Sequence, residues 1–356
     1  MSILQKYIFS KYLKLFLIIL FSLELFFVIF EFVQNLDAIP SSANLVALYI
    51  FYNAIFTLTI ALPLSLVFAW IVMLIIMIRN NEIISIFSLG SRKRNLFLPV
   101  ITINLLAILT LVALQSSPLA YAYEKKKQIL EGDYFSSLKE DIFVKYNNYY
   151  VYFKKLYPLE NRAEDVEIFE LNNKDLVKTI SAKKAYFQNN RWYVIDANII
   201  NKPKEMDFDK TKLTYSYEKF IYTLDGFKPK ILDNVYTQNA NYSIIDALEA
   251  YFVLSKQGVN TDKIRAIIYY QTIIPLFAIP LVFIYYMFIS MSNRFFEPKI
   301  YTSATIFGTL FVWGGFFLFY KFGISGVILP ELALVLPFVI LCLVAYLIYL
   351  KKPIPS

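Results

Sequence analysis

The chain has 356 residues, of which 58% are hydrophobic and only 17% are charged. This composition excludes an ordinary soluble globular protein and indicates a membrane protein. The formal net charge is +8, and the sequence contains no histidine and one cysteine, Cys342. Without histidine, the commonest general base and metal ligand, most hydrolase and metalloenzyme functions are disfavoured. A single cysteine can form no intrachain disulfide.

Six apolar segments are long enough to cross a membrane. A transmembrane helix needs about 20 apolar residues to span a hydrocarbon core of ~30 Å. A long polar segment separates the third from the fourth, so the chain is expected to divide into spans 1–3 (residues 1–121), an inserted domain (122–262) and spans 4–6 (263–356). The expected spans lie near residues 12–33, 50–78, 96–121, 267–290, 300–320 and 327–350.

Lysine and arginine in the short loops indicate the orientation, because cationic loops resist translocation. The N-terminus has three such residues, the 79–95 loop four, the 291–299 loop two and the C-terminus two, eleven in all. The loops on the other side have only Lys321. We therefore expect both termini and the 79–95 loop to be cytoplasmic and the inserted domain to lie outside.

The stretch RNNEIISIFSLGSRK, residues 79–93, predicts a short amphipathic helix near 80–90 between the second and third spans. Asn80 or Asn81 can cap it, Glu82 suits the positive end of the helix dipole, and Gly90 can end it in the left-handed conformation. A helix of this kind can dock into a groove on a cytoplasmic partner. It can equally be an interfacial connector, with its basic cluster serving as a topology anchor.

The inserted domain has the pattern of β-strands. NNYYVYFKKL, AEDVEIFEL, LVKTISAKKAYFQ and RWYVIDANI are short, roughly alternating and rich in aromatic and β-branched residues, and turn signals separate them. Strands at this spacing predict a sandwich or jelly roll. The expected fold class is thus an α-helical membrane protein with six spans and an all-β, jelly-roll-like domain between helices 3 and 4. A helical segment after this domain would return the chain to the membrane.

Ionisable residues in or beside the spans are candidate functional groups, because charges are costly in the membrane. Glu24 and Glu31 lie seven residues apart and therefore on one face of the first helix. Glu24 would either contact substrate or a gate, or be buried against a neighbouring helix. Lys125, Lys126 and Lys127 lie just beyond the third span, where they would meet lipid phosphates or form a solvated helix face.

The chain has nine glycines and no G-x-x-x-x-G-K-[ST] motif. If transport is driven by ATP, then ATP and Mg must be bound by a separate subunit, and the 79–94 loop is the expected place for that subunit to dock. No cofactor is expected in this chain.

The order of these segments resembles the LptF/LptG family of lipopolysaccharide export permeases. The resemblance rests on ALPLSLVFA in the second span, NNEIISIFSLGSRKRNLFLPV across the following loop, TISAKKAYFQNNRWYVIDANI in the β domain, LSKQGVNTDKIRAIIYYQTIIPLFAIPL entering the fourth span and KFGISGVILPELALVLPFVI in the last loop and span. The short first outer loop favours the LptG type.

This resemblance implies a permease subunit of an ATP-binding-cassette exporter in the bacterial inner membrane. Two such permeases would pair around a cavity, with a dimer of LptB-like cytoplasmic ATPases below. The complex would extract lipopolysaccharide and hand it to a periplasmic bridge of LptC/LptA-like proteins, with no nucleic acid involved. The first and fifth spans would form the lateral entrance. The residues that would couple to the ATPase are Glu82, Ile83, Ile86, Phe87, Gly90 and Arg92.

The resemblance also implies a substrate cavity or gate, for which Glu24, Phe27 and Glu31 of the first span are candidates. The outer end of that span, EFVQNLDAIP, is acidic where the family usually offers basic residues. The candidates for contacts with lipid phosphates are therefore Lys321, Lys125, Lys126 and Lys127. Two alternatives stay open: a permease for another amphiphile such as a lipoprotein, and a non-transporting scaffold that presents a periplasmic β domain.

Overall fold

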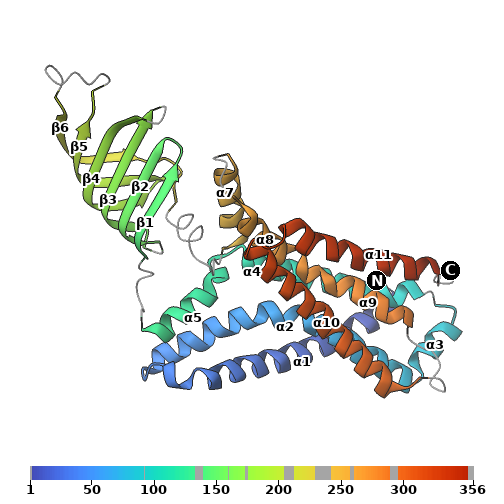
Figure 1. Cartoon of the computed structure of the whole chain (residues 1–356). Coiled ribbons are helices and arrows are strands. Elements are labelled where there is room, and N and C mark those ends of the chain that lie inside the picture. The colour runs from blue at the N-terminus through green and yellow to red at the C-terminus, as the bar shows by residue number, and fades with distance from the viewer. Residues whose placement is uncertain are drawn as a thin grey trace. The chain divides into compact units, whose positions relative to one another are not determined.

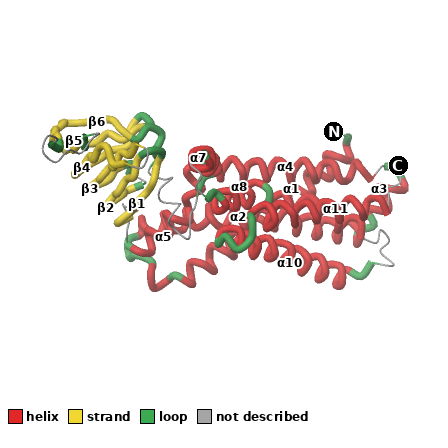
Figure 2. The backbone as a smooth tube through the Cα atoms, turned by 45° about the horizontal axis from the view of Figure 1, so that its top comes forward, coloured by secondary structure: helices red, strands yellow, loops and turns green. Residues whose placement is uncertain are grey.

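The computed structural model describes residues 2–91, 93–132, 139–158, 160–172, 175–203, 212–228, 242–256, 260–288 and 296–351. The chain divides into two compact units, each described here by itself (Figure 1). The first comprises Met1–Lys127, Tyr242–Tyr251 and Asn260–Ser356, and the second comprises Gln128–Asn241 and Phe252–Val259. Figure 2 shows that the strands are confined to the second unit.

The first half of the helical unit contains three long helices and one short one. They are α1 (Ile3–Gln34), α2 (Ala43–Arg79), α3 (Glu82–Ser88) and α4 (Lys93–Gln115), with 3-10 turns at Leu36–Ala38 and Pro118–Tyr121. α2 has 37 residues and is assigned as one helix across Pro63. At 1.5 Å per residue it is about 55 Å long, which exceeds a hydrocarbon core of ~30 Å.

The second half contains a broken helix and two further spans. α8 (Asp262–Thr272) is followed by the 3-10 turn Ile274–Phe277 and α9 (Ala278–Phe288), with a bend of 41°. Pro275 in this turn has no N–H to donate to the preceding turn, which explains the break. α10 (Pro298–Ile324) and α11 (Leu336–Lys351) follow, the latter preceded by a π-helical turn, Glu331–Val335.

Among the described residues, five helices are long and apolar enough to cross a membrane, and the bent pair α8–α9 makes a sixth candidate. This agrees with the helical membrane protein that the sequence predicted.

The core of the helical unit is centred on α2, which is the most buried of the spans. Trp70 of α2 is fully buried, and its indole N–H donates to the carbonyl oxygen of Val282 in α9 at 2.9 Å. Tyr12 of α1 donates to the carbonyl oxygen of Leu66 at 2.9 Å and accepts from the amide of Asn104 in α4 at 3.2 Å. These bonds satisfy polar groups that would otherwise be buried without partners, and they fix α1, α4 and α9 around α2.

α1, α10 and α11 keep large apolar surfaces uncovered. Exposed side chains include Phe26 and Phe30 on α1, Phe307 and Phe311 on α10, and Val339 on α11. In a protein with membrane-spanning helices such surfaces face lipid or another membrane subunit.

The β unit is a six-stranded antiparallel sheet in which every strand pairs with its neighbours in sequence (Figure 1). The strands are β1 (Lys139–Tyr146), β2 (Tyr149–Tyr157), β3 (Arg162–Asn172), β4 (Asp175–Gln188), β5 (Arg191–Asn201) and β6 (Thr214–Thr223). The order is that of a meander, and the described residues contain one sheet, not the two packed layers of a sandwich or jelly roll. Short turns between most of the strands favour pairing with the next strand along the chain.

One face of the sheet carries the core of this unit. Fully buried side chains include Val151 and Phe153 of β2 and Trp192 of β5, whose indole N–H donates to the carbonyl oxygen of Phe227 at 2.7 Å. Two further helices, α5 (Ala122–Glu131) and α7 (Ile244–Ser255), lead into and out of this unit.

Candidate functional site

The short helix α3 is tied to α1 through its first residue. The carboxylate of Glu82 accepts from the ammonium group of Lys11 at 2.5 Å, from the hydroxyl of Tyr7 at 2.8 Å, and from the amide of Asn80 at 3.1 Å. Lys11 and Tyr7 belong to α1, so one carboxylate joins the two helices. Burial alone would raise the pKa of Glu82, but the hydrogen bonds from Lys11, Asn80 and Tyr7 outweigh it and lower the pKa.

The apolar face of α3 is turned into the helical unit. Ile83 and Ile86 are buried, at 1% and 9% exposure, and belong to the core that surrounds α2. Their side chains therefore face the chain's own core in this structure, and their part in coupling to an ATPase stays a prediction. The sequence predicted the amphipathic pattern, but the apolar face is occupied by the chain itself. The exposed apolar residues of this segment are Ile84 and Leu89, at 43% and 84%.

Gly90 ends α3 with φ +74°, in the left-handed region. Its N–H donates to the carbonyl oxygen of Phe87 at 3.0 Å, and the N–H of Ser91 donates to that of Ile86 at 3.3 Å. This pair of bonds is the Schellman motif, which satisfies carbonyl groups at a helix end. Phe87 is partly buried against the same core as Ile86. Arg92, the last predicted coupling residue, lies outside the described residues.

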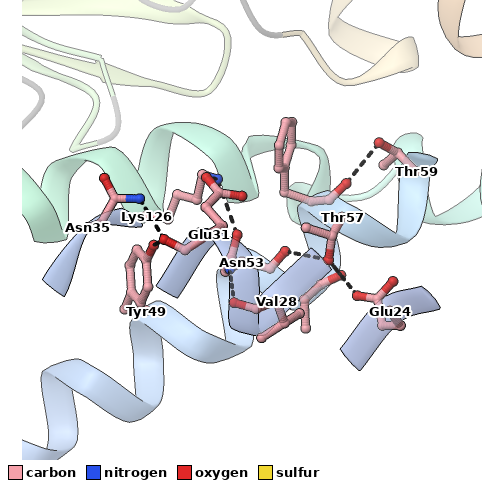
Figure 3. Close-up of polar contacts among 11 residues, drawn as sticks. Glu24, Val28, Glu31, Asn35, Tyr49, Asn53, Thr57, Thr59 and Lys126 are labelled. Carbon is pink, nitrogen blue, oxygen red and sulfur yellow. Dashed lines mark hydrogen bonds and ion pairs between the residues drawn. The ribbon is translucent and has the colours of Figure 1, made fainter. Parts of the chain in front are cut away.

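A second polar cluster joins α1, α2 and α5 (Figure 3). The ammonium group of Lys126 on α5 forms an ion pair with Glu31 of α1 and donates to the amide oxygen of Asn53 of α2 at 3.2 Å. It also lies 4.3 Å from the ring centroid of Phe56, within range of a cation–π contact. Lys126 is only 2% exposed. The basic cluster predicted to meet lipid phosphates has thus one member that is buried and already paired.

Glu24 lies two helical turns before Glu31 on the same face of α1. One of its carboxylate oxygens accepts from the hydroxyl of Thr57 at 2.6 Å, while the other oxygen is buried and has no hydrogen-bond partner. Asn53 and Thr57 of α2 are four residues apart and face α1 together. Sequence reasoning did not select these two residues, although two polar side chains at this spacing in an apolar span were a usable signal.

The other predicted substrate residues do not join this cluster. Phe27 is half-buried beside Phe26, at 5.6 Å between ring centroids. Lys321 is exposed at the end of α10, with its ammonium group 5.5 Å from the ring centroid of Phe317. Lys125 is half-buried and Lys127 is exposed. The structure therefore brings together Glu24, Glu31 and Lys126 of the predicted set.

Comparison with known proteins identifies the chain at the family level. A search of curated proteins finds no match. A family model described as the lipopolysaccharide export system permease LptF/LptG matches residues 6–351, almost the whole chain. The six span candidates and the inserted antiparallel sheet are in keeping with that match. The chain therefore belongs to the LptF/LptG family of lipopolysaccharide export system permeases, and is a transport component rather than an enzyme.

Proposed function

We propose that this chain is the permease subunit of an ATP-binding-cassette exporter in the bacterial inner membrane, which extracts lipopolysaccharide and passes it to a periplasmic bridge of LptC/LptA-like proteins. ATP and Mg are bound by a separate, LptB-like cytoplasmic ATPase dimer, and a second LptF/LptG permease completes the cavity. Both termini and α3 face the cytoplasm, and the β sheet lies in the periplasm. The membership of the chain in the permease family and the loop charges support this assignment.

The observation that carries the proposal is the connection of α3 to the spans. An ion pair joins Glu82 to Lys11 of α1, and buried Ile83 and Ile86 join α3 to the core around α2. A short helix held by both contacts moves together with the spans that it touches. Movement of an ATPase bound to α3 is therefore transmitted to α1 and α2.

The surface of α3 that meets the ATPase is formed by Ile84 and Leu89, the exposed apolar residues of the segment. Glu82, Ile83, Ile86, Phe87 and Gly90 position this surface from behind. This division refines the set of coupling residues expected from the sequence. Exposed apolar side chains rimmed by polar ones are typical of protein interaction sites.

The uncovered apolar faces of α1 and α10 line the cavity shared with the second permease and form its lateral entrance. Phe26 and Phe30 of α1 and Phe311 of α10 meet acyl chains there. The face of α1 that packs on α2 carries Glu24 and Glu31, with Phe27 beside it. These residues fix the position of α1 at the entrance. Lys321, exposed at the end of α10, is the cation available to a lipid phosphate at that end.

The test uses the full chain co-expressed with its ATPase and the second permease. Leu89→Asp places a charge in the proposed contact and should reduce ATPase co-purification at least tenfold, with a parallel loss of ATP-driven lipopolysaccharide release from proteoliposomes. Ile3→Asp is the matched control, because Ile3 is similarly exposed, at 90%, on the same side of the membrane. Unchanged co-purification and release in Leu89→Asp would refute the coupling surface.

The same preparation separates the alternatives. If no ATPase co-purifies with the wild-type chain, the scaffold function is favoured. If the ATPase is bound but a lipoprotein is released in place of lipopolysaccharide, the chain is a permease for another amphiphile.

A further inference from the structure

A row of alternating charges crosses all six strands of the sheet. The ladders skip one position on each strand, and the pairs on either side of that position align six residues in succession: Asp141, Lys154, Asp165, Lys183, Asp196 and Lys219. The three aspartates have φ of 56°, 50° and 53°, in the left-handed region that Asp tolerates better than most residues. Lys154 and Asp165 form an ion pair at 3.5 Å.

This row marks a shift in the alternation of each inner strand. In β3 the buried residues Ala163 and Val166 are three apart instead of two, and in β5 Val194 and Ala197 are three apart. Asp165 and Asp196 lie in the extra step and are exposed on the face away from the core. The row is therefore a regular feature of the outer face, and its charges are not needed to complete the core.

Beside this row the outer face is hollowed. A cavity of about 610 Å³ is lined by four residues of the charged row and by the neighbouring row, with Val166 and Ala182 between them. The neighbouring row consists of Tyr152, Glu167, Ser181, Asn198 and Tyr217. Tyr152 on β2 and Tyr217 on β6 stand at its two ends in the same row, four strands apart. At ~4.8 Å between neighbouring strands, this separation is about 19 Å.

The two terminal tyrosine rings are held in place by the aspartates of the charged row. The hydroxyl of Tyr152 donates to Asp141, and that of Tyr217 donates to Asp196, both at 2.5 Å. The hydroxyl groups are thus occupied and the ring faces remain to make contacts. Tyr217 is 62% exposed, which is high for a large aromatic side chain that is fixed by a hydrogen bond.

The chemistry of this lining selects one class of ligand. Two lysines and three carboxylates line the hollow (Lys154, Lys183, Asp165, Glu167 and Asp196), so its formal charge is 2 − 3 = −1. A strongly anionic or cationic ligand gains little there. A chain of sugars fits, because each hydroxyl both donates and accepts, and Lys, carboxylate, Ser181 and Asn198 offer both kinds of partner across the hollow. The apolar C–H face of a sugar ring packs on a flat aromatic ring such as Tyr217.

We propose that this hollow on the outer face of the sheet binds the oligosaccharide part of the transported amphiphile. The inference rests on the proposed function, in which the cargo is a lipopolysaccharide and so carries a glycan as well as acyl chains. Sugars stack on the tyrosine at either end, and the charged row between them hydrogen-bonds the hydroxyl groups. The site thus holds the glycan of the cargo against the outer face of the sheet.

The experiment titrates the full chain in nanodiscs with a lipid-free, neutral oligosaccharide of the lipopolysaccharide that carries neither phosphate nor carboxylate groups, and measures heat of binding. We expect saturable binding that Tyr217→Ala weakens about tenfold and that Ser181→Trp abolishes by filling the hollow. Lys183→Ala, a surface change with little risk to folding, should weaken binding about threefold or more. Tyr222→Ala is the matched control: Tyr222 is an exposed tyrosine of the same strand, at 55%, outside the hollow.

Several results would overturn the site. Absence of saturable binding to the wild-type chain is one, and an equal loss of affinity in Tyr222→Ala is another. Competition by inorganic phosphate alone would mean an anion site, and capture of a protein by a photo-crosslinker placed at position 183 would mean a protein interface. ATP-driven release of lipopolysaccharide, measured with the same chain and its partners, distinguishes a failure of the glycan site from a failure of the proposed function. Release without oligosaccharide binding overturns this site alone, whereas absence of release overturns the proposed function.

Discussion

The buried ion pair between Lys126 and Glu31 provides a quantitative test of how firmly α5 is held against α1. The two side chains are unequally buried, at 3% and 25% exposure. Removing one member of a buried pair costs about 3–5 kcal/mol when the remaining charge stays buried. Glu31→Gln leaves the ammonium group of Lys126 enclosed, with Asn53 and the rings of Phe56 and Tyr123 still beside it, and should reach this range.

Lys126→Met should cost less, about 2 kcal/mol, because water reaches the Glu31 carboxylate and the main loss is the bond to Asn53. The double variant removes both charges and should be less destabilised than Glu31→Gln alone. The assay is hydrogen–deuterium exchange of the α5 amides in the full chain. A cost of ~2.8 kcal/mol corresponds to about 100-fold faster exchange.

Lys125→Met is the control, since Lys125 is a neighbour on the same helix that lies outside this ion pair, and its replacement should change exchange less than threefold. Exchange in β4 reports on the β unit and should be unchanged in all variants. The reasoning is refuted if Lys126→Met exchanges faster than Glu31→Gln, or if the effects of the two single changes add in the double variant.

Two further predictions concern α3. Gly90→Ala should destabilise the end of α3 by about 1–2 kcal/mol, because alanine is strained at the left-handed φ of position 90, while no atom lies within 4 Å of the new methyl group. Amide exchange in α3 should become faster, and an unchanged exchange rate would contradict the prediction. The lowered pKa of Glu82 means that its tie to Lys11 is fully present above the ordinary carboxyl value of 4.5 and is lost as the pH falls through the depressed value. Exchange in α3, corrected for intrinsic rates, should therefore be constant from pH 8 to pH 5 and rise below pH 4.5, and Glu82→Gln should abolish this rise.

The helical architecture was predictable because membrane spans are specified by length and apolarity, which are local properties of the sequence. The break of the fourth span lies at Pro275, whose missing N–H is likewise a local property. The end of α3 was equally local, since only glycine adopts the conformation of Gly90 without cost. These features need no knowledge of which helix packs on which.

The partners of the charged residues were not predictable from local pattern. Lys126 and Glu31 are 95 residues apart, and only the packing of α5 across α1 and α2 brings them together. The direction of the apolar face of α3 was open for the same reason, because an amphipathic pattern does not say whether Ile83 and Ile86 meet a partner or their own core.

In the β unit, β2 to β5 were predicted from their aromatic and β-branched residues, while β1 and β6 were not singled out. Both of these edge strands carry several charged side chains and exposed aromatic ones, which blur the alternating pattern. The charged row left a readable trace in the adjacent polar pairs of FKKL, AEDV and AKKA. Each pair interrupts the strict alternation of its strand, and the three interruptions lie side by side in the sheet. Their alignment becomes visible only once the strand register is known.

The ties at the two ends of α1 have a mechanical consequence. Lys11 binds Glu82 of α3, and Glu31, twenty residues later, binds Lys126 of α5. At 1.5 Å per residue the two ties are about 30 Å apart, which is the thickness of a hydrocarbon core. A continuous helix between them is stiff, so a displacement of α3 either carries α5 with it or breaks one of the two ion pairs. The uncovered apolar face of α1 lies between these ties, so a movement that begins at α3 would also shift this face.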